Sequence, residues 1–299
     1  MLAHAVEWKC QSPKMSPKFR SLHLTLNVIF ALVVAASSGW AASSPWVQAP
    51  KAKARLLVGG AAQGSSGSPL AFIEIALEPG WKTYWRTPGD AGGLPPSFDW
   101  SKSTNLAAAT VAFPAPHRFT DKSGSTIGYM DELVLPVTLT PLNKGEPITL
   151  VVGVHYGICK DICIPVEAEL ALDVPAGVSE ALPADVEETL KRVPRPQDNL
   201  AAGDPVLVRA VATLEGASPK IAVEATFAGD GAGADVFLEA PDGLFLPLPE
   251  RVGDIDGTGR ALFEAALGTD VDLAALKGKP VTVTLVSESG ASFATFVAQ

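Results

Sequence analysis

The chain has 299 residues, 47% of them apolar, and its 23 basic against 32 acidic residues give a net charge of −9. This length favours two domains over one, and the apolar content excludes a disordered chain because it can fill one or two hydrophobic cores. The acidic balance disfavours nucleic acids and anionic membrane surfaces as partners.

The first 41 residues have the features of an export signal. A basic region with Lys14, Lys18 and Arg20 precedes an apolar run at 22–36 (LHLTLNVIFALVVAA), and the tripeptide 39–41 (GWA) suits a cleavage site. The alternative is an uncleaved membrane anchor, but a run of 15 residues is shorter than the roughly 20 that a spanning helix needs. We therefore predict a cleaved signal peptide and a mature protein that is periplasmic and soluble.

Most of the remaining chain has the pattern of β-structure. Its many prolines and glycines, 25 and 27 in the whole chain, indicate short strands and turns. Apolar alternation predicts two strands within residues 52–77 and one strand each at 106–113, 133–139, 148–159 and 162–174. The last two strands are expected to form a hairpin, and the segment between 113 and 133 is expected to be a loop.

One short helix is predicted at residues 183–193 (PADVEETLKRV). Pro183 suits its first turn, and Lys191 and Arg192 suit its C-terminal end. Residues 206–299 are again rich in predicted strands. The predicted organisation is therefore all-β, with a signal peptide at 1–41, a β-sandwich domain at 42–180, a helical linker at 181–205 and a second β-sandwich domain at 206–299.

Part of the second predicted domain echoes the first. Residues 277–297 (KGKPVTVTLVSESGASFATFV) and 144–166 (KGEPITLVVGVHYGICKDICIPV) each have Lys-Gly-x-Pro, an alternating strand, a turn and a return strand. We infer two related sandwich domains, the second without the cysteine hairpin. The alternative is that both segments use turns common to all β-sandwiches.

Two cysteines stand where the two strands of the predicted hairpin meet. If residues 160–162 (KDI) are a three-residue turn, Cys159 and Cys163 face each other, with Cα atoms roughly 4.5–5.5 Å apart. That separation lies within the usual disulfide range of about 4.4–6.8 Å. A bridge that closes so short a loop adds only about 2 kcal/mol of stability, and its exposure at a turn favours exchange. Spacing alone leaves a structural and a redox-active bridge both open.

A metal site is a third interpretation of the same cysteines. His155, Cys159 and Cys163 could together hold copper(I) or zinc, but no fourth ligand follows nearby, and His155 alternatively sits on a sandwich face. Residues 254–259 (DIDGTG) hint at a calcium loop, yet Glu264 is misplaced as its last ligand, so a turn is predicted there. The chain has no P-loop, G-x-G-x-x-G or G-x-S-x-G motif. No cofactor and no small-molecule substrate are therefore predicted.

Three blocks, in this order, resemble a known family: WKTYWRTPGDAGGLPP, FPAPHRFTDKSGSTIGYMDELVLPV and YGICKDICIPVEAEL. They resemble the N-terminal periplasmic domain of the DsbD family of thiol:disulfide interchange proteins, and most closely its copper-tolerance (ScsB-like) and alphaproteobacterial branch. The resemblance covers residues 48–175. Residues 206–299 resemble, more weakly, the second sandwich domain of that branch. The resemblance implies an immunoglobulin-like β-sandwich.

The resemblance also implies an activity. Cys159 and Cys163 would be a redox pair that takes electrons from a membrane-embedded DsbD/CcdA-like reductant and passes them to periplasmic thioredoxin-like proteins. Cys159 would be the partner in mixed disulfides. The chain has neither the family's multi-helix membrane region nor its C-terminal thioredoxin-like domain, so we expect the reductant to act in trans. The alternative is a non-enzymatic periplasmic β-sandwich, either an adaptor with a structural disulfide or a copper-binding protein.

Further site residues follow from the same resemblance. The family shields its disulfide with a cap loop that carries an aromatic side chain, and acidic residues lie near its site. The matching loop here spans 117–129, although its acidic residues could equally be ordinary solvated positions. The candidate cap or supporting residues are Phe119, Tyr129, Asp121, Asp131, Glu132 and Tyr156.

Overall fold

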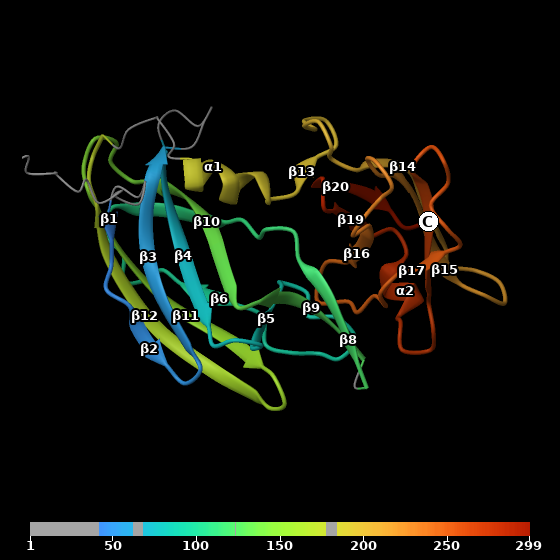
Figure 1. Cartoon of the computed structure of the whole chain (residues 1–299), viewed down its shortest axis with the longest axis horizontal. Helices are drawn as coiled ribbons and strands as arrows, with labels where there is room; N and C mark the ends of the chain where they lie inside the picture. Colours follow the sequence, from blue (N-terminus) through green and yellow to red (C-terminus); the bar gives the residue numbers. More distant parts are fainter. Residues whose placement is uncertain (1–41, 62–67, 123, 178–183) are drawn as a thin grey trace, which may run out of the picture. The chain divides into compact units, whose positions relative to one another are not determined.

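The computed structural model describes residues 42–61, 68–122, 124–177 and 184–299 (Figure 1). The predicted signal peptide lies outside the described residues. Among the described helices, none is long and apolar enough to cross a membrane. The described chain is almost entirely β-structure, as predicted, and its strands form four sheets, two before and two after residues 184–191.

The first pair of sheets contains twelve strands. These are β1 (Ala42–Ser43), β2 (Val47–Ala49), β3 (Ala52–Ala61), β4 (Pro69–Leu77), β5 (Lys82–Tyr84), β6 (Ser97–Asp99), β7 (Leu106–Val111), β8 (His117–Asp121), β9 (Gly124–Met130), β10 (Glu132–Pro141), β11 (Ile148–Cys159) and β12 (Cys163–Val174). One sheet has the order β1-β3-β4-β10-β7 with β2 paired to β3, and the other has the order β12-β11-β5-β9-β8 with β6 paired to β11.

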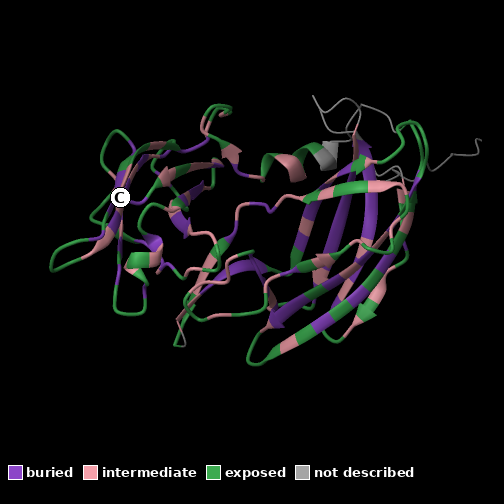
Figure 2. Ribbon diagram, turned by 180° about the vertical axis from the view of Figure 1, so that it is seen from behind, coloured by how far each residue is buried: buried purple, intermediate pink, exposed green. Residues whose placement is uncertain are grey.

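The core between these two sheets follows the period-two pattern of strands that bury one face. In β11, Ile148, Leu150, Val152 and Val154 are all buried, whereas the residues between them are exposed or half-buried. Figure 2 shows this alternation of buried and less buried positions along the long strands. The alternation that predicted these strands from the sequence is thus the pattern that forms the sandwich.

The second pair of sheets lies C-terminal to helix α1 (Ala184–Lys191). Its strands are β13 (Arg195–Pro196), β14 (Val206–Thr213), β15 (Lys220–Thr226), β16 (Asp235–Glu239), β17 (Glu250–Val252), β18 (Arg260–Ala266), β19 (Pro280–Ser287) and β20 (Gly290–Val297). The short helix α2 (Leu273–Leu276) connects β18 and β19. The strand orders are β13-β20-β19-β16 and β14-β15-β18-β17. The predicted strand-rich region at 206–299 is confirmed.

The prediction of a loop between residues 113 and 133 is wrong. Its residues form an antiparallel hairpin of β8 and β9, which is joined to the sheet through β5. The sequence conceals this hairpin because glycines and polar residues interrupt its alternation. Packing decides the structure instead, since Ile127 and Tyr129 of β9 are buried in the core.

Candidate functional site

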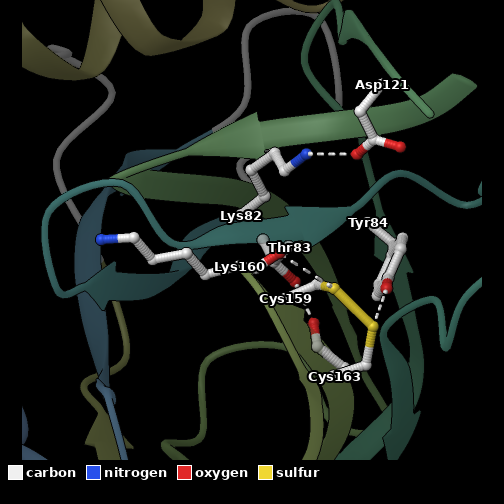
Figure 3. Close-up of a disulfide and its surroundings, with 8 residues drawn as sticks. Lys82, Thr83, Tyr84, Asp121, Cys159, Lys160 and Cys163 are labelled. Atoms are coloured by element: carbon white, nitrogen blue, oxygen red, sulfur yellow. Dashed lines mark hydrogen bonds and ion pairs between the residues drawn. A yellow bond between two sulfur atoms is a disulfide. The ribbon is translucent and has the colours of Figure 1, made fainter. Parts of the chain in front are cut away.

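The two cysteines close the tip of the longest hairpin in the described chain. Strands β11 and β12 pair without interruption from Ile148 and Val174 to Cys159 and Cys163, and the last pair forms a disulfide. The Cα atoms of the bridged residues are 4.2 Å apart, and Lys160 N donates to Ile162 O at 3.1 Å within the turn. The facing arrangement and the three-residue turn predicted from the sequence are therefore confirmed (Figure 3).

The two sides of the bridge differ in exposure. Cys159 is half-buried because Lys82 of β5 pairs with it on the side away from β12. Cys163 is exposed, since β12 is the edge strand of its sheet and has a neighbour on one side only. Ile162 in the turn is 64% exposed. A partner protein can therefore reach the tip from the edge of the sheet.

Tyr84, at the end of β5, contacts the disulfide directly. Its hydroxyl oxygen lies 3.3 Å from Cys163 Sγ (Figure 3). Because a disulfide sulfur carries no hydrogen, the hydroxyl is the donor in this contact. The side chain is only 3% exposed, and this burial raises the pKa of Tyr84 above its usual value. Tyr84 therefore stays protonated at neutral pH and remains a donor.

The ring of Tyr84 packs closely against the backbone of two glycines. A Cβ atom added to Gly157 of β11 would lie 2.9 Å from Tyr84 Cε2, and one added to Gly93 would overlap the ring from another direction. Gly157 N also donates to Leu94 O at 2.8 Å, which ties the chain after Gly93 to β11. Tyr84 was not among the residues predicted for the site, and the glycine inside a strong strand pattern was the available signal for a close approach.

Two of the predicted candidates, Phe119 and Asp121, converge on Lys82. Lys82 Nζ lies 4.0 Å from Asp121 Oδ2 and 5.2 Å from the centre of the Phe119 ring. Lys82 is the neighbour of Cys159 in the sheet. Strand β8 thus brings an aromatic and an acidic side chain to the strand next to the disulfide (Figure 3 shows the ion pair).

The two tyrosines that were predicted as cap or supporting residues lie in the core instead. Tyr129 is 2% exposed and donates to Pro114 O at 2.8 Å, and burial raises its pKa well above the usual value. Tyr156 is fully buried, its hydroxyl has no partner among the described residues, and burial raises its pKa to about 12. Each residue lies on the same face of its strand as a buried core residue two positions earlier, Ile127 for Tyr129 and Val154 for Tyr156.

The remaining acidic candidates serve other parts of the fold. Asp131 has a φ of 65° and accepts a hydrogen bond from Gly80 N at 2.9 Å, so it closes a turn. Glu132 begins β10, where burial and the neighbouring Glu74 raise its pKa. Asp131 thus lies beside the start of β5, where its N donates to Trp81 O at 3.2 Å, but its carboxylate bonds Gly80 N, whereas Glu132 lies in the other sheet.

Neither of the sequence segments considered for metal binding forms a cluster of ligands. His155 Nδ1 lies 3.4 Å from Glu167 Oε1 on the next strand. Within the described ranges, no group of three or more His, Cys, Asp or Glu side chains could hold a metal ion. At the predicted turn, Asp256 Oδ1 accepts hydrogen bonds from Thr258 N and Arg260 N at 2.8 and 3.0 Å, which is a turn held by its own side chain.

Comparisons with known proteins agree with this geometry. Residues 53–175 match the family model described as "Thiol:disulfide interchange protein DsbD, N-terminal". A comparison with curated proteins found no match. The crystal structure of the N-terminal periplasmic domain of ScsB from Proteus mirabilis is similar, with a TM-score of 0.64 and 19% identity over 86% of this chain and 98% of that one. This likeness confirms the predicted immunoglobulin-like sandwich fold, and the chain carries a DsbD N-terminal-like domain.

Proposed function

We propose that the chain is a periplasmic thiol–disulfide exchange protein. Cys159 and Cys163 relay electrons between a membrane-embedded DsbD/CcdA-like reductant, acting in trans, and proteins of the thioredoxin fold. The observation that carries the proposal is a disulfide at the exposed tip of a hairpin within a DsbD N-terminal-like domain. A bridge that closes so small a ring stabilises the fold by only about 2 kcal/mol, so stability alone is a weak reason for it.

The chemistry requires two successive exchanges. A thiolate of the reductant attacks one sulfur of the bridge, the Cys159–Cys163 bond breaks, and its electron pair stays on the other sulfur. A second reductant thiol then displaces the chain from the mixed disulfide, which leaves two reduced cysteines and an oxidised reductant. The same steps in reverse order pass the two electrons to the disulfide of a thioredoxin-fold acceptor.

Export and domain organisation complete the proposal. The signal peptide expected at 1–41 would deliver the protein to the periplasm, the compartment named for the similar ScsB domain. The exchange site would belong to a domain at 42–180, followed by a helical linker at 181–205 and a second sandwich at 206–299. Because β19 and β20 contain no cysteine, the second sandwich would contribute binding or positioning rather than electron transfer.

A trapping experiment tests the exchange function. The variants Cys159→Ala and Cys163→Ala are each mixed with a periplasmic thioredoxin-fold protein whose C-x-x-C motif keeps only its first cysteine, activated as a mixed disulfide with thionitrobenzoate, which is the group that leaves. The variant lacking both cysteines is the control. We expect a mixed disulfide with at least one single-cysteine variant, visible on a non-reducing gel and assigned by mass spectrometry.

The reduction potential of the wild-type bridge gives the decisive comparison. A potential below about −300 mV, together with no trapped partner, would identify a structural bridge and overturn the exchange function. Tight copper(I) binding by the reduced protein, lost when the cysteines are alkylated, would instead favour a copper-binding role. A potential above that limit together with trapping supports the proposal.

A further inference from the structure

The two sulfurs of the bridge have different hydrogen-bonding neighbours. Cys163 Sγ faces the hydroxyl of Tyr84, a donor, at 3.3 Å. Cys159 Sγ lies 4.0 Å from the carbonyl oxygen of Lys160, an acceptor. A thiolate is stabilised by donors and destabilised by acceptors. These two neighbours therefore stabilise a negative charge on the sulfur of Cys163 and destabilise one on the sulfur of Cys159.

Two lysines lie on the Cys159 side of the bridge. Lys82 Nζ lies beside Asp121 Oδ2, whose charge offsets its own, and Lys160 Nζ donates to the neutral carbonyl oxygen of Pro79 at 3.3 Å. Lys160 therefore keeps its charge and favours a Cys159 thiolate, so the direct hydrogen bond from Tyr84 has to be the stronger effect. Tyr84 provides the hydrogen bond that the structure directs to the bridge (Figure 3).

The position of the Tyr84 hydroxyl is fixed by packing rather than by the disulfide. The ring is 3% exposed and fits against Gly93 and Gly157, where a Cβ atom at either position would collide with it. The chain next to the ring is held as well, because Trp85 N donates to Ile127 O at 3.0 Å. Because these contacts involve neither sulfur, we expect them to persist when the bridge is reduced and to keep the hydroxyl where Cys163 Sγ can receive its hydrogen bond.

We propose that Tyr84 donates its hydroxyl hydrogen bond to the Cys163 thiolate of the reduced protein and so concentrates the thiolate of the pair on Cys163. Reduction by a protein dithiol supplies two electrons, which break the bridge; of the two protons that the dithiol loses, one binds Cys159 and the other is released to solvent when Cys163 is a thiolate. The hydrogen of Tyr84 is shared with the Cys163 thiolate and is not transferred. This role rests on the proposed exchange function for its purpose, because the thiolate is the species that attacks a partner disulfide.

The exposure of Cys163 acts in the same direction as Tyr84. A thiolate on the exposed residue of the edge strand combines thiolate character with access, the two properties that govern exchange. The reactive sulfur of the reduced protein is then Cys163, the reverse of the order expected from the sequence. Cys159, half-buried against β5, is left to displace the partner from the mixed disulfide.

Alkylation of the reduced protein tests the role of Tyr84. Iodoacetamide is added between pH 6 and 11, and mass spectrometry of peptides follows each cysteine separately. In the wild type we expect Cys163 to have the lower pKa. In Tyr84→Phe, which keeps the ring, we expect the pKa of Cys163 to rise by about one unit. The rate at neutral pH should then fall about threefold, because increased nucleophilicity offsets part of the lost thiolate.

Thr83→Val is the matched control. It removes a hydrogen bond between β5 and β11, Thr83 Oγ1 to Gly157 O, and leaves the Tyr84 hydroxyl intact. We expect it to lower the thermal stability without changing which cysteine has the lower pKa. A shift of the same size in Thr83→Val and Tyr84→Phe would mean that both act by loosening the hairpin, and would overturn the proposal.

Two further outcomes would overturn the role of Tyr84. One is a wild-type protein in which Cys159 has the lower pKa, a measurement that needs no variant to fold. The other is an unchanged pKa of Cys163 in a folded Tyr84→Phe. The assay uses no partner protein, so a pKa shift without any trapped partner would support Tyr84 while rejecting the exchange function. A trapped partner without a pKa shift of Cys163 would support the exchange function while rejecting the role of Tyr84.

Discussion

The hairpins β11–β12 and β19–β20 begin alike and end differently. Each follows a Lys-Gly-x-Pro turn whose glycine has a positive φ, 84° at Gly145 and 79° at Gly278. Aligned on these turns, the second hairpin ends its first strand at Ser287, the equivalent of Val154. The first hairpin continues through residues 155–159 before it turns. Its cysteines therefore lie on an extension that the second hairpin does not have.

The two tips also differ in what surrounds them. In the second hairpin, a Cβ atom on Gly290 would lie 3.2 Å from the backbone nitrogen of Asp204, and the following Ala291 is 2% exposed. In the first hairpin, Cys163 is exposed. In the second hairpin the turn residues Glu288 and Ser289 are exposed as well, so the two tips differ in length and in the presence of cysteines rather than in exposure. The cysteine site therefore lies on the part of the first hairpin that extends beyond the length of the second.

Removal of the disulfide should separate the function of the extended tip from its stability. We expect Cys159→Ala/Cys163→Ala to abolish electron transfer to a thioredoxin-fold acceptor. Because the bridge closes a small ring, the free energy of unfolding should fall by only about 2 kcal/mol. Urea denaturation and a gel-shift assay of the acceptor measure the two effects. Ser287→Ala, at the other tip, is the control and should leave transfer unchanged.

Two results would contradict this separation. Electron transfer that survives in the double variant would place the redox centre elsewhere. A loss of unfolding free energy far above that expected for so small a ring would make the extended tip a structural element.

The sequence predicts the site to the extent that the site is local. The facing cysteines follow from alternation and a three-residue turn, both of which lie within one hairpin. Tyr84 is 79 residues away from Cys163 in the sequence, and its place depends on how β5 pairs with β11. The resemblance suggested aromatic residues near the site but could not separate Phe119 from Tyr129. An aromatic side chain can occupy either face of a strand. Which face is buried depends on how the strands pair in the sheet, and the sequence does not show that pairing.

Two glycines of β11, Gly157 and Gly153, offer a matched test of how tightly Tyr84 is packed. A Cβ atom on Gly157 would lie 2.9 Å from Tyr84 Cε2 and 3.0 Å from Leu94 Cβ, whereas one on Gly153 would meet Asp99 Cβ at an ordinary 3.6 Å. We expect Gly157→Ala to lower the free energy of unfolding by about 1–3 kcal/mol, the usual effect of overpacking. Gly153→Ala should change it by less than about 0.5 kcal/mol.

The same pair of variants tests whether this packing matters for the bridge. Since Gly157→Ala displaces Tyr84, it should also raise the pKa of Cys163 in the alkylation assay, and Gly153→Ala should not. Equal effects of the two alanines on stability would show that Tyr84 is free to move, and would remove the basis for a fixed donor. Urea denaturation at neutral pH gives the comparison.

The smallest effect is expected in the shorter hairpin, at a buried hydroxyl. Thr284 of β19 is fully buried, and its hydroxyl has no hydrogen-bond partner among the described residues. Its equivalent in the first hairpin is Val151, which carries a methyl group in place of the hydroxyl. Burying an unpaired hydroxyl costs about 1–3 kcal/mol, so we expect Thr284→Val to raise the free energy of unfolding by about 1 kcal/mol.

The control for this substitution lies two residues earlier on the same strand. Thr282 is half-buried, and its hydroxyl is 3.2 Å from that of Thr295 on β20. Thr282→Val should therefore change the free energy of unfolding by less than about 0.5 kcal/mol. If Thr284→Val is instead destabilising, its hydroxyl has a partner in solution, such as a buried water. The face of β19 opposite the core residues Val283 and Leu285 would then contain a satisfied polar site.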